Sequence, residues 1–332
     1  MATLKDVAKL ANVDISTVSR AINNTSYVHP DTKRKIFAAV EQLSYKPNVL
    51  ARGLKQGKLC TIGVIVPSIS LSVFGEMVQG IESQAHKMGY SIMICNTEDN
   101  PDLEEQYLER LRNSFLDGIL IASTGQNNRL IRDIKASGIS VMQMIRKQDK
   151  EISSVIADYF ECGYEGVRYL VSKGCKHIGF INGSTQIIPY KERYRGYHKA
   201  MKEYGYEEHL ANSLLPRGNF FKDGYDGVLQ LLEEVPELDG IMVAMDIQGI
   251  GAIRALKERK IAIPEKIKVI SLTGHSIGGM LETTMTSMEM PAREMGEQVV
   301  KMIIKDIEAK ENEKPSLQHL VFATSLVERE TT

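Results

Sequence analysis

The chain has 332 residues, of which 43% are hydrophobic, 25% charged and 6% aromatic. This length is typical of about two domains, and the composition is too apolar for a disordered chain. Residues 1–58 carry ten Lys or Arg against four Asp or Glu, a net charge of +6, whereas the other 274 residues carry −7. This asymmetry predicts a small head that binds a polyanion and an acidic body attached to it.

Several classes of protein are disfavoured by the same data. The N-terminus is polar from the start, and no apolar run reaches the ~18 residues needed to cross a bilayer. Four cysteines are widely separated and have no metal-ligand spacing, which is typical of reduced thiols. We therefore expect a cytoplasmic protein with no membrane segment, no metal site and no cofactor.

Three helices are expected at the N-terminus. A capping-box pattern at 3–6 precedes the first helix, Asp14 can cap a second helix through 15–20, and a third fits 31–44. A helix-turn-helix with a bracing third helix lays its second helix in the major groove of DNA. The residues expected on the outward face of that helix are Ile15, Ser16, Ser19 and Arg20. From the residues alone, a helical domain with a solvated basic face is an alternative.

Several short motifs in this head resemble the LacI/GalR (lactose-repressor) family of bacterial transcription regulators. The matching strings are TLKDVAKLANV at 3–13, TVSR at 17–20, INN at 22–24, YKPN at 45–48 and ARGL at 51–54. The resemblance implies that Ile15, Ser16 and Arg20 read bases. It also implies phosphate contacts from Thr17, Ser19, Asn23 and His29.

The resemblance further implies a hinge at 47–58 that folds only on the operator. A segment of this length is too short for a stable helix in isolation. In the family, two copies of the hinge pack in the minor groove, and a leucine from each wedges into the central base step. Leu54 holds that position here, with Ala51 and Lys55 beside it. A flexible linker in the absence of DNA is compatible with the same sequence.

From Cys60 onward, apolar runs alternate with amphipathic segments. The strand-like runs are 61–66, 91–95, 118–122, 139–144, 177–182, 240–244 and 268–272. The helical patterns are at about 73–88, 102–114, 159–173, 190–204, 224–234, 246–259 and 291–308. This alternation predicts two successive α/β units, each a parallel sheet with helices on both faces.

The family resemblance covers the body too and implies a two-lobed fold like that of periplasmic binding proteins, with a small-molecule effector between the lobes. The predicted fold class is therefore α/β, with a small all-α head. The expected domains are a head at 1–46, a hinge at 47–58 and a body at 59–332. The N-lobe is expected at about 59–157 and 290–321, and the C-lobe at about 158–289 and 322–332.

The effector site is expected at the ends of the strands. The string ERYRGY at 192–197 matches a family motif that makes Arg193 the main cationic contact. Asp246 matches a family aspartate, although it can equally be a favourable charge at a helix N-terminus. Phe74 and Phe220 occupy ring-stacking positions, and either can instead be a core residue.

Other positions depart from the family pattern. Ile145 replaces an aspartate and leaves Arg146 as the matched neighbour, while Thr273 and His275 stand where the family has carboxylates. Met245 and Met290 replace the usual Asn and Gln. The effector therefore cannot be transferred from a known member. A sugar or sugar phosphate is the leading class, with a purine or a phosphocarrier protein as alternatives.

One short motif in the body also suggests an enzyme. The string GHSIGG at 274–279 contains G-x-S-x-G after a strand, the setting of a hydrolase nucleophile, here Ser276. However, strand formers at 283–288 oppose the long helix that should follow. Only Asp306 and His319 remain downstream as partners, and both lie on regular elements. We therefore expect no enzyme but a homodimeric repressor that binds a pseudopalindromic operator under the control of its effector.

Overall fold

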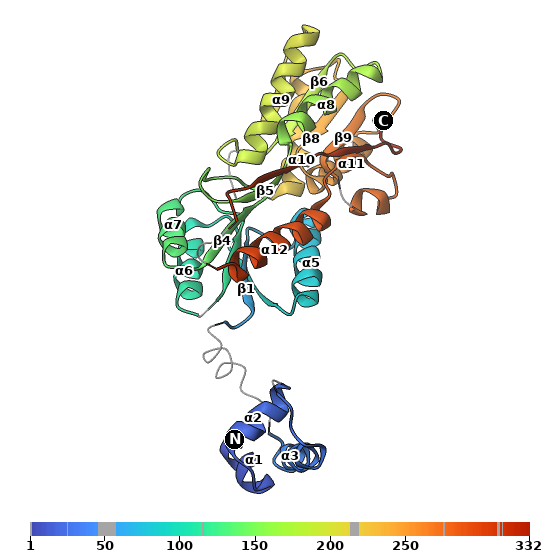
Figure 1. The fold of residues 1–332 in the computed structure, drawn as a ribbon. Coiled ribbons are helices and arrows are strands. Elements are labelled where there is room, and N and C mark those ends of the chain that lie inside the picture. Colours follow the sequence, from blue (N-terminus) through green and yellow to red (C-terminus); the bar gives the residue numbers. More distant parts are fainter. Residues whose placement is uncertain are drawn as a thin grey trace. The chain divides into compact units, whose positions relative to one another are not determined.

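The computed structural model describes residues 2–24, 26–45, 58–114, 116–212, 219–274, 276–310, 313 and 315–332. The chain divides into two compact units, Met1–Leu59 and Cys60–Thr332, which are described separately below. The first unit is helical, and the second consists of two α/β lobes (Figure 1).

The first unit is a helix-turn-helix with a third helix. Its helices are α1 (Leu4–Ala11), α2 (Ile15–Asn23) and α3 (Pro30–Gln42). Thr3 and Asp6 form the predicted capping box on α1, and Asp14 Oδ1 accepts the backbone N–H of Ser16 at 2.7 Å to cap α2. These local bonds satisfy helix N-termini that would otherwise lack partners.

A small apolar core holds the three helices together. Val7, Val18 and Ile36, one from each helix, are fully buried in it. The third helix begins at Pro30 rather than 31 and ends at Gln42 rather than 44. It ends early because Ser44 has a left-handed backbone conformation, with φ +46°, that cannot continue the helix.

The N-lobe is built on a parallel sheet in the order β11-β5-β4-β3-β1-β2. Its strands are β1 (Thr61–Val66), β2 (Ser91–Asn96), β3 (Gly118–Ile121), β4 (Ser140–Met144), β5 (Ser154–Ala157) and β11 (His319–Phe322). On one face lie α5 (Ser72–Lys87) and α12 (Ala292–Glu308), and on the other α6 (Pro101–Arg112) and α7 (Asn128–Ala136). The sheet is therefore buried on both faces, as a parallel sheet requires.

The C-lobe repeats this plan with the sheet order β12-β10-β9-β8-β6-β7, in which only β12 is antiparallel to its neighbour. Its strands are β6 (Ile178–Asn182), β7 (His209–Asn212), β8 (Gly240–Val243), β9 (Lys268–Gly274), β10 (Thr286–Glu289) and β12 (Ser325–Val327). One face carries α8 (Tyr159–Ser172) and α9 (Ile188–Tyr204), and the other α10 (Phe220–Glu234) and α11 (Asp246–Glu258).

The chain passes between the two sheets three times: after β5, after β10 and after β11. Each lobe is thus assembled from segments that are distant in sequence. The carboxyl ends of both sets of parallel strands face the space between the lobes, where ligands of open α/β sheets bind.

Every expected strand and helix of the body is present, with ends within four residues of the prediction. The elements α7, β5, β7 and β12 are not among the predicted ones. The three strands have only three or four residues and carry little periodic signal, whereas α7 is clearly amphipathic and its pattern was missed. No helix within the described ranges is long and apolar enough to span a membrane.

Candidate DNA-binding and effector sites

The outward face of α2 carries most of the predicted DNA contacts. Ile15 is 40% exposed, and Ser16 and Arg20 are exposed, whereas Val18 on the opposite face is fully buried. Amphipathic spacing thus turns an aliphatic side chain, a hydroxyl and a guanidinium toward solvent together. These are side-chain types that can contact a thymine methyl, a phosphate and a guanine edge.

The remaining predicted head residues lie around the ends of α2 and α3. Thr17 and Ser19 are half-buried, and the exposed Asn23 donates its side-chain amide to the Ser19 carbonyl at 2.9 Å. His29 caps α3, since its Nδ1 accepts the backbone N–H of Asp31 at 3.3 Å. Asn23 and His29 therefore also have roles inside the head. The hinge residues Ala51, Leu54 and Lys55 lie outside the described residues.

An inner chamber lies between the lobes of the body. Its volume is about 30 Å³, the share of one water molecule in the liquid. The lining residues are Leu71, Val73, Phe74, Asp99, Ile145, Arg146, Tyr159, Ile187, Pro189, Tyr190, Arg193, Met245, Thr273 and Met290. Four predicted effector residues are thus brought together here: Phe74, Arg146, Arg193 and Thr273.

Arg193 is a buried cation on α9. It is 3% exposed, its guanidinium lies 5.1 Å from the ring centroid of Tyr159, and its Nε has no hydrogen-bond partner among the described residues. No carboxylate in the described part of the chain forms an ion pair with it. A Cβ on Gly163 of α8 would clash with the Arg193 carbonyl. The close packing of α8 against α9 at this glycine therefore fixes the position of the Arg193 backbone.

Arg146, in contrast, is neutralised inside the chamber. Its guanidinium forms a two-pronged ion pair with Asp99, in which Nη2 and Oδ2 are 3.0 Å apart. The Arg146 side chain is 5% exposed and that of Asp99 12%. Asp99 and Ile145, which lie where β2 and β4 end, have positive φ values of 53° and 63°. Such backbone strain is concentrated at functional sites in proteins.

The C-lobe side of the chamber is a network of neutral polar groups. Tyr190 donates its hydroxyl to the Met245 sulfur at 2.8 Å, and Asn182 donates to the Tyr190 carbonyl at 3.1 Å. The Asn182 Oδ1 is buried without a partner among the described residues. Burial raises the pKa of Tyr190 to about 12, so the phenol stays protonated at neutral pH.

A larger outer pocket of about 380 Å³ adjoins the chamber. It shares Leu71, Val73, Met245 and Thr273 with the chamber. The predicted residues Phe220 and Asp246 line this outer pocket rather than the chamber. Asp246 is 3% exposed and accepts the Ser271 hydroxyl at 2.6 Å. Phe220 is half-buried, whereas Phe74 is buried and belongs to the N-lobe core as well.

The sequence reasoning missed Asp99, Tyr159 and Tyr190. A usable signal exists for Asp99, because it follows a predicted strand at the carboxyl edge of the sheet. The tyrosines carry no such signal, since each lies in the first turn of a helix, where an aromatic side chain can equally be a core residue. His275 lies outside the described residues. Within the described ranges, no group of three His, Cys, Asp or Glu side chains is placed to hold a metal.

The hydrolase alternative is not supported by the geometry. After β9 the chain enters only a short 3-10 helix, Ser276–Met280, and the Ser276 hydroxyl donates to Glu76 Oε1 at 3.4 Å. His319 lies in the other lobe, where its ring nitrogens contact Ser154 and Lys150, each at 2.9 Å. No imidazole therefore reaches Ser276 among the described residues, so a catalytic triad is not formed.

A helix-turn-helix joined to a two-lobed body with a cavity between its lobes defines a ligand-responsive DNA-binding regulator. Residues 3–48 match the model for bacterial regulatory proteins of the lacI family. Residues 60–322 match the model for periplasmic binding proteins and the sugar-binding domain of the LacI family. The chain belongs to the LacI family of bacterial regulators, and it is a transcription regulator rather than an enzyme.

Known proteins resemble the chain over its whole length. The HTH-type transcriptional regulator RegA of Clostridium saccharobutylicum is 32% identical, with 100% of both chains covered. The ribose operon repressor of Halalkalibacterium halodurans is 28% identical, covering 100% of this chain and 97% of that protein. The structure of the Lac repressor bound to ONPG in the repressed state has a TM-score of 0.87 at 24% identity, covering 100% and 99% of the two chains.

Proposed function

We propose that this regulator is a homodimeric repressor whose operator affinity is controlled by an anionic carbohydrate of the sugar-phosphate class. The observation that carries the proposal is the buried guanidinium of Arg193, which has no carboxylate partner among the described residues. A buried charge without a partner is costly, and a bound anion would remove that cost. Asp99 already neutralises Arg146, so Arg193 is the cation of the chamber that an anionic group on the effector would neutralise.

The two cavities suggest how such an effector would lie. A volume of about 30 Å³ does not admit a sugar ring, whereas the outer pocket of about 380 Å³ has the size of small-molecule sites. We place the ring in the outer pocket beside Phe220 and Asp246, and its anionic group at Arg193. Binding would then require Leu71 and Met245, which lie where the cavities adjoin, to move apart. Effector binding would thus change the angle between the lobes.

The first prediction tests this effector class. In a thermal-shift screen of the full chain, a sugar phosphate at 100 times its dissociation constant should add about 2.7 kcal/mol of stability. The matching free sugar and purine bases should add much less at the same concentration. Arg193→Gln should remove the difference between the sugar phosphate and the free sugar. If a free sugar or a purine base stabilises the protein equally well, the anionic class is wrong.

On the DNA side, we propose that the second helix of each head reads one half of a pseudopalindromic operator. Ile15, Ser16 and Arg20 would contact bases, while Thr17, Ser19, Asn23 and His29 would contact phosphates. The hinge residues Ala51, Leu54 and Lys55 would fold in the minor groove and kink the operator. The bounds of 1–46 for the head, 47–58 for the hinge and 59–332 for the body stay predictions.

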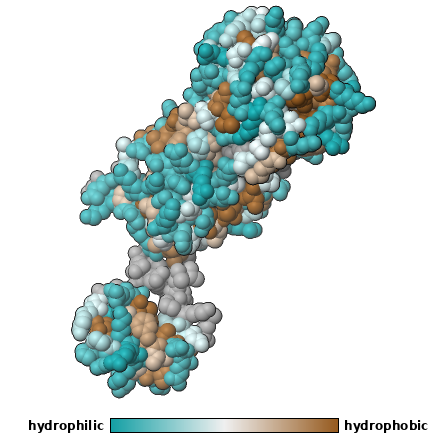
Figure 2. All heavy atoms as spheres, turned by 90° about the vertical axis from the view of Figure 1, so that its right-hand side faces the viewer, coloured by the Kyte–Doolittle hydropathy of each residue, from teal (hydrophilic) through white to brown (hydrophobic). Residues whose placement is uncertain are grey.

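Exposed apolar side chains favour the dimer. On the edge strand β2, Met93 and Ile94 are 46% and 44% exposed, and in the C-lobe Met280 is 77% exposed. Figure 2 shows apolar patches among polar residues on the surface of the body. Clustered exposed apolar groups on a protein surface mark contacts with partners.

A cytoplasmic location is proposed because an operator-binding protein acts where the DNA is.

A further inference from the structure

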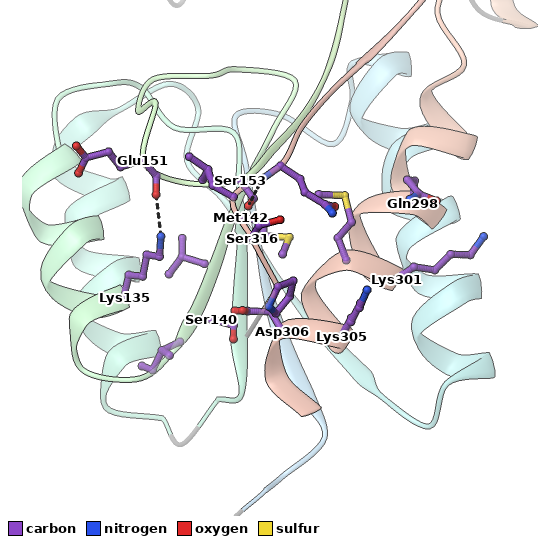
Figure 3. A pocket seen from close by; sticks show the side chains of 16 residues that line it. Lys135, Ser140, Met142, Glu151, Ser153, Gln298, Lys301, Lys305, Asp306 and Ser316 are labelled. Atoms are coloured by element: carbon purple, nitrogen blue, oxygen red, sulfur yellow. Dashed lines mark hydrogen bonds between the residues drawn. The ribbon is translucent and has the colours of Figure 1, made fainter. Parts of the chain in front are cut away.

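A slot opens at the amino end of β4 in the N-lobe, far along the strand from Arg146 (Figure 3). Its volume is about 430 Å³. It exists because β5 pairs with β4 only at Gln143 and Met144, so the neighbour that would flank the first three residues of β4 is missing. The residues that line it are Lys135, Ile139, Ser140, Val141, Met142, Glu151, Ser153, Gln298, Lys301, Met302, Lys305, Asp306, Pro315, Ser316, Leu317 and Gln318.

The backbone of Val141 faces this slot. Gln143 and Ile145 donate their N–H groups toward β5, each at 2.9 Å, whereas Ser140 donates toward β3, to the Asp117 carbonyl. Directions alternate along a strand, and in a parallel ladder the N–H and C=O of one residue point to the same side. Val141 therefore directs both groups toward the missing neighbour, and the residue as a whole is 4% exposed at the base of the slot. Backbone groups in such a position need a partner.

The walls of the slot suit an extended chain. Met142 packs in the core beneath α12, and Val141 in the core beneath α7, so the slot cuts through the plane of the sheet. The far wall is formed by residues 315–318, which are held in place where Gln318 donates its N–H to the Ser153 hydroxyl at 3.1 Å. A strand placed between these walls would direct alternate side chains toward the two opposite helices.

Both helices present ammonium groups at the rim. Lys301 and Lys305 lie one turn apart on α12, exposed, and neither is in an ion pair with another described residue (Figure 3). Across the slot, Lys135 donates to the backbone carbonyl of Glu151 at 2.8 Å rather than to a carboxylate. Asp306 and Glu151 also line the slot, so three basic residues stand beside two acidic ones. This excess of positive charge favours an occupant that carries acidic side chains.

We propose that this slot binds an extended acidic segment of a partner protein, which adds as a strand along Val141. The backbone of the segment would pair with the Val141 N–H and C=O. Its acidic side chains, at every second position, would contact Lys301 and Lys305 on α12, and the intervening apolar side chains would face α7. Strand addition of this kind takes its affinity from main-chain bonds and its specificity from side-chain contacts. A small anion is a weaker explanation, because it would leave the apolar floor and the Val141 backbone groups unused.

The test uses the full chain and a capped peptide in which valine and glutamate alternate. Peptide binding should slow amide hydrogen exchange at Val141 by about tenfold or more. N-methylation of the peptide amides removes strand pairing and should weaken binding by about tenfold. Lys301→Glu together with Lys305→Glu should weaken it by at least about tenfold through charge repulsion. The C-lobe pair Lys199→Glu and Lys222→Glu makes the same charge change and should leave binding unaltered.

Three results would overturn the proposal. The first is no binding of the peptide to the folded wild-type chain. The second is binding that leaves exchange at Val141 unchanged. The third is equal affinity for the N-methylated peptide, which would identify a site for anions only. Circular dichroism of each variant establishes that it is folded, and none of these outcomes depends on the effector or the operator.

Discussion

At the scale of single residues, Arg20 joins a local pattern to a function. It is exposed on the same face of α2 as Ile15 and Ser16, because the opposite face is buried against α1 and α3. A guanidinium can bond the O6 and N7 atoms of one guanine at once. The expected role is therefore recognition of one base and not only attraction to DNA.

Arg20→Ala should lower operator affinity by about 1–3 kcal/mol and relax the preference at one base position. The measurement is a binding titration against operators in which each base is changed in turn. An equal loss of affinity on every sequence would show that Arg20 contacts phosphate instead.

In the body, Asp99 is a single residue whose role can be tested in the same way. It neutralises the buried Arg146, and removing one partner of a buried pair leaves the other charge uncompensated. Asp99→Asn should therefore destabilise the protein by about 3–5 kcal/mol, measured by urea unfolding.

A matched control for Asp99 is Asp226→Asn. Asp226 forms an ion pair with Lys222 on the exposed surface of α10, where water and salt screen the charges. This substitution should change the free energy of unfolding far less than Asp99→Asn. Similar effects of both substitutions would mean that the Arg146–Asp99 pair is solvated.

At the scale of elements, the hinge proposed at 47–58 would connect the two functions. The pair of helices α8 and α9 shows how regular elements place a side chain in this protein, because their close contact at Gly163 positions Arg193. The proposed hinge would have a different basis, because a helix of its length is marginal in water without a partner. Its folding is expected to depend on the operator.

Leu54→Ala should reduce operator bending while leaving the head folded, because alanine is too short to wedge into a base step. A circular-permutation gel assay measures the bend, and circular dichroism follows the head. Unchanged bending by the variant would assign the kink to another residue.

At the scale of the whole molecule, the division of charge separates the two functions. Residues 1–58 carry +6 and the rest −7, so a dimer presents about +12 at its heads. Cationic heads release counterions from DNA on binding, whereas an acidic body is repelled by phosphate. The heads and hinges are then the DNA-binding surface, and the lobes are left for the effector.

Operator affinity of the full chain should accordingly fall steeply with salt. If six to ten phosphates are contacted, it should drop by about 10³–10⁵ between 50 and 200 mM salt. Titrations of operator DNA at several salt concentrations give the slope. A shallow slope would mean that few of the head's charges contact phosphate.

The sequence by itself determined the head, the charge division and the alternation of strands and helices in the body. These features depend on near neighbours: Thr3 bonds Asp6 three residues away, and strand and helix periods are visible within one segment. The family motifs around Arg193 and α2 are local in the same sense, and they led to the right family.

Only the tertiary structure decided the state of the effector cleft and the β4 slot. Arg146 and Asp99 are 47 residues apart, and nothing local predicts that they pair. The size of the chamber depends on two lobes assembled from four separated stretches of chain. The slot depends on the β4–β5 ladder, which starts three residues after β4 begins. Cavities and buried charge pairs follow from how distant segments pack against each other. The residue pattern within one segment does not encode that packing.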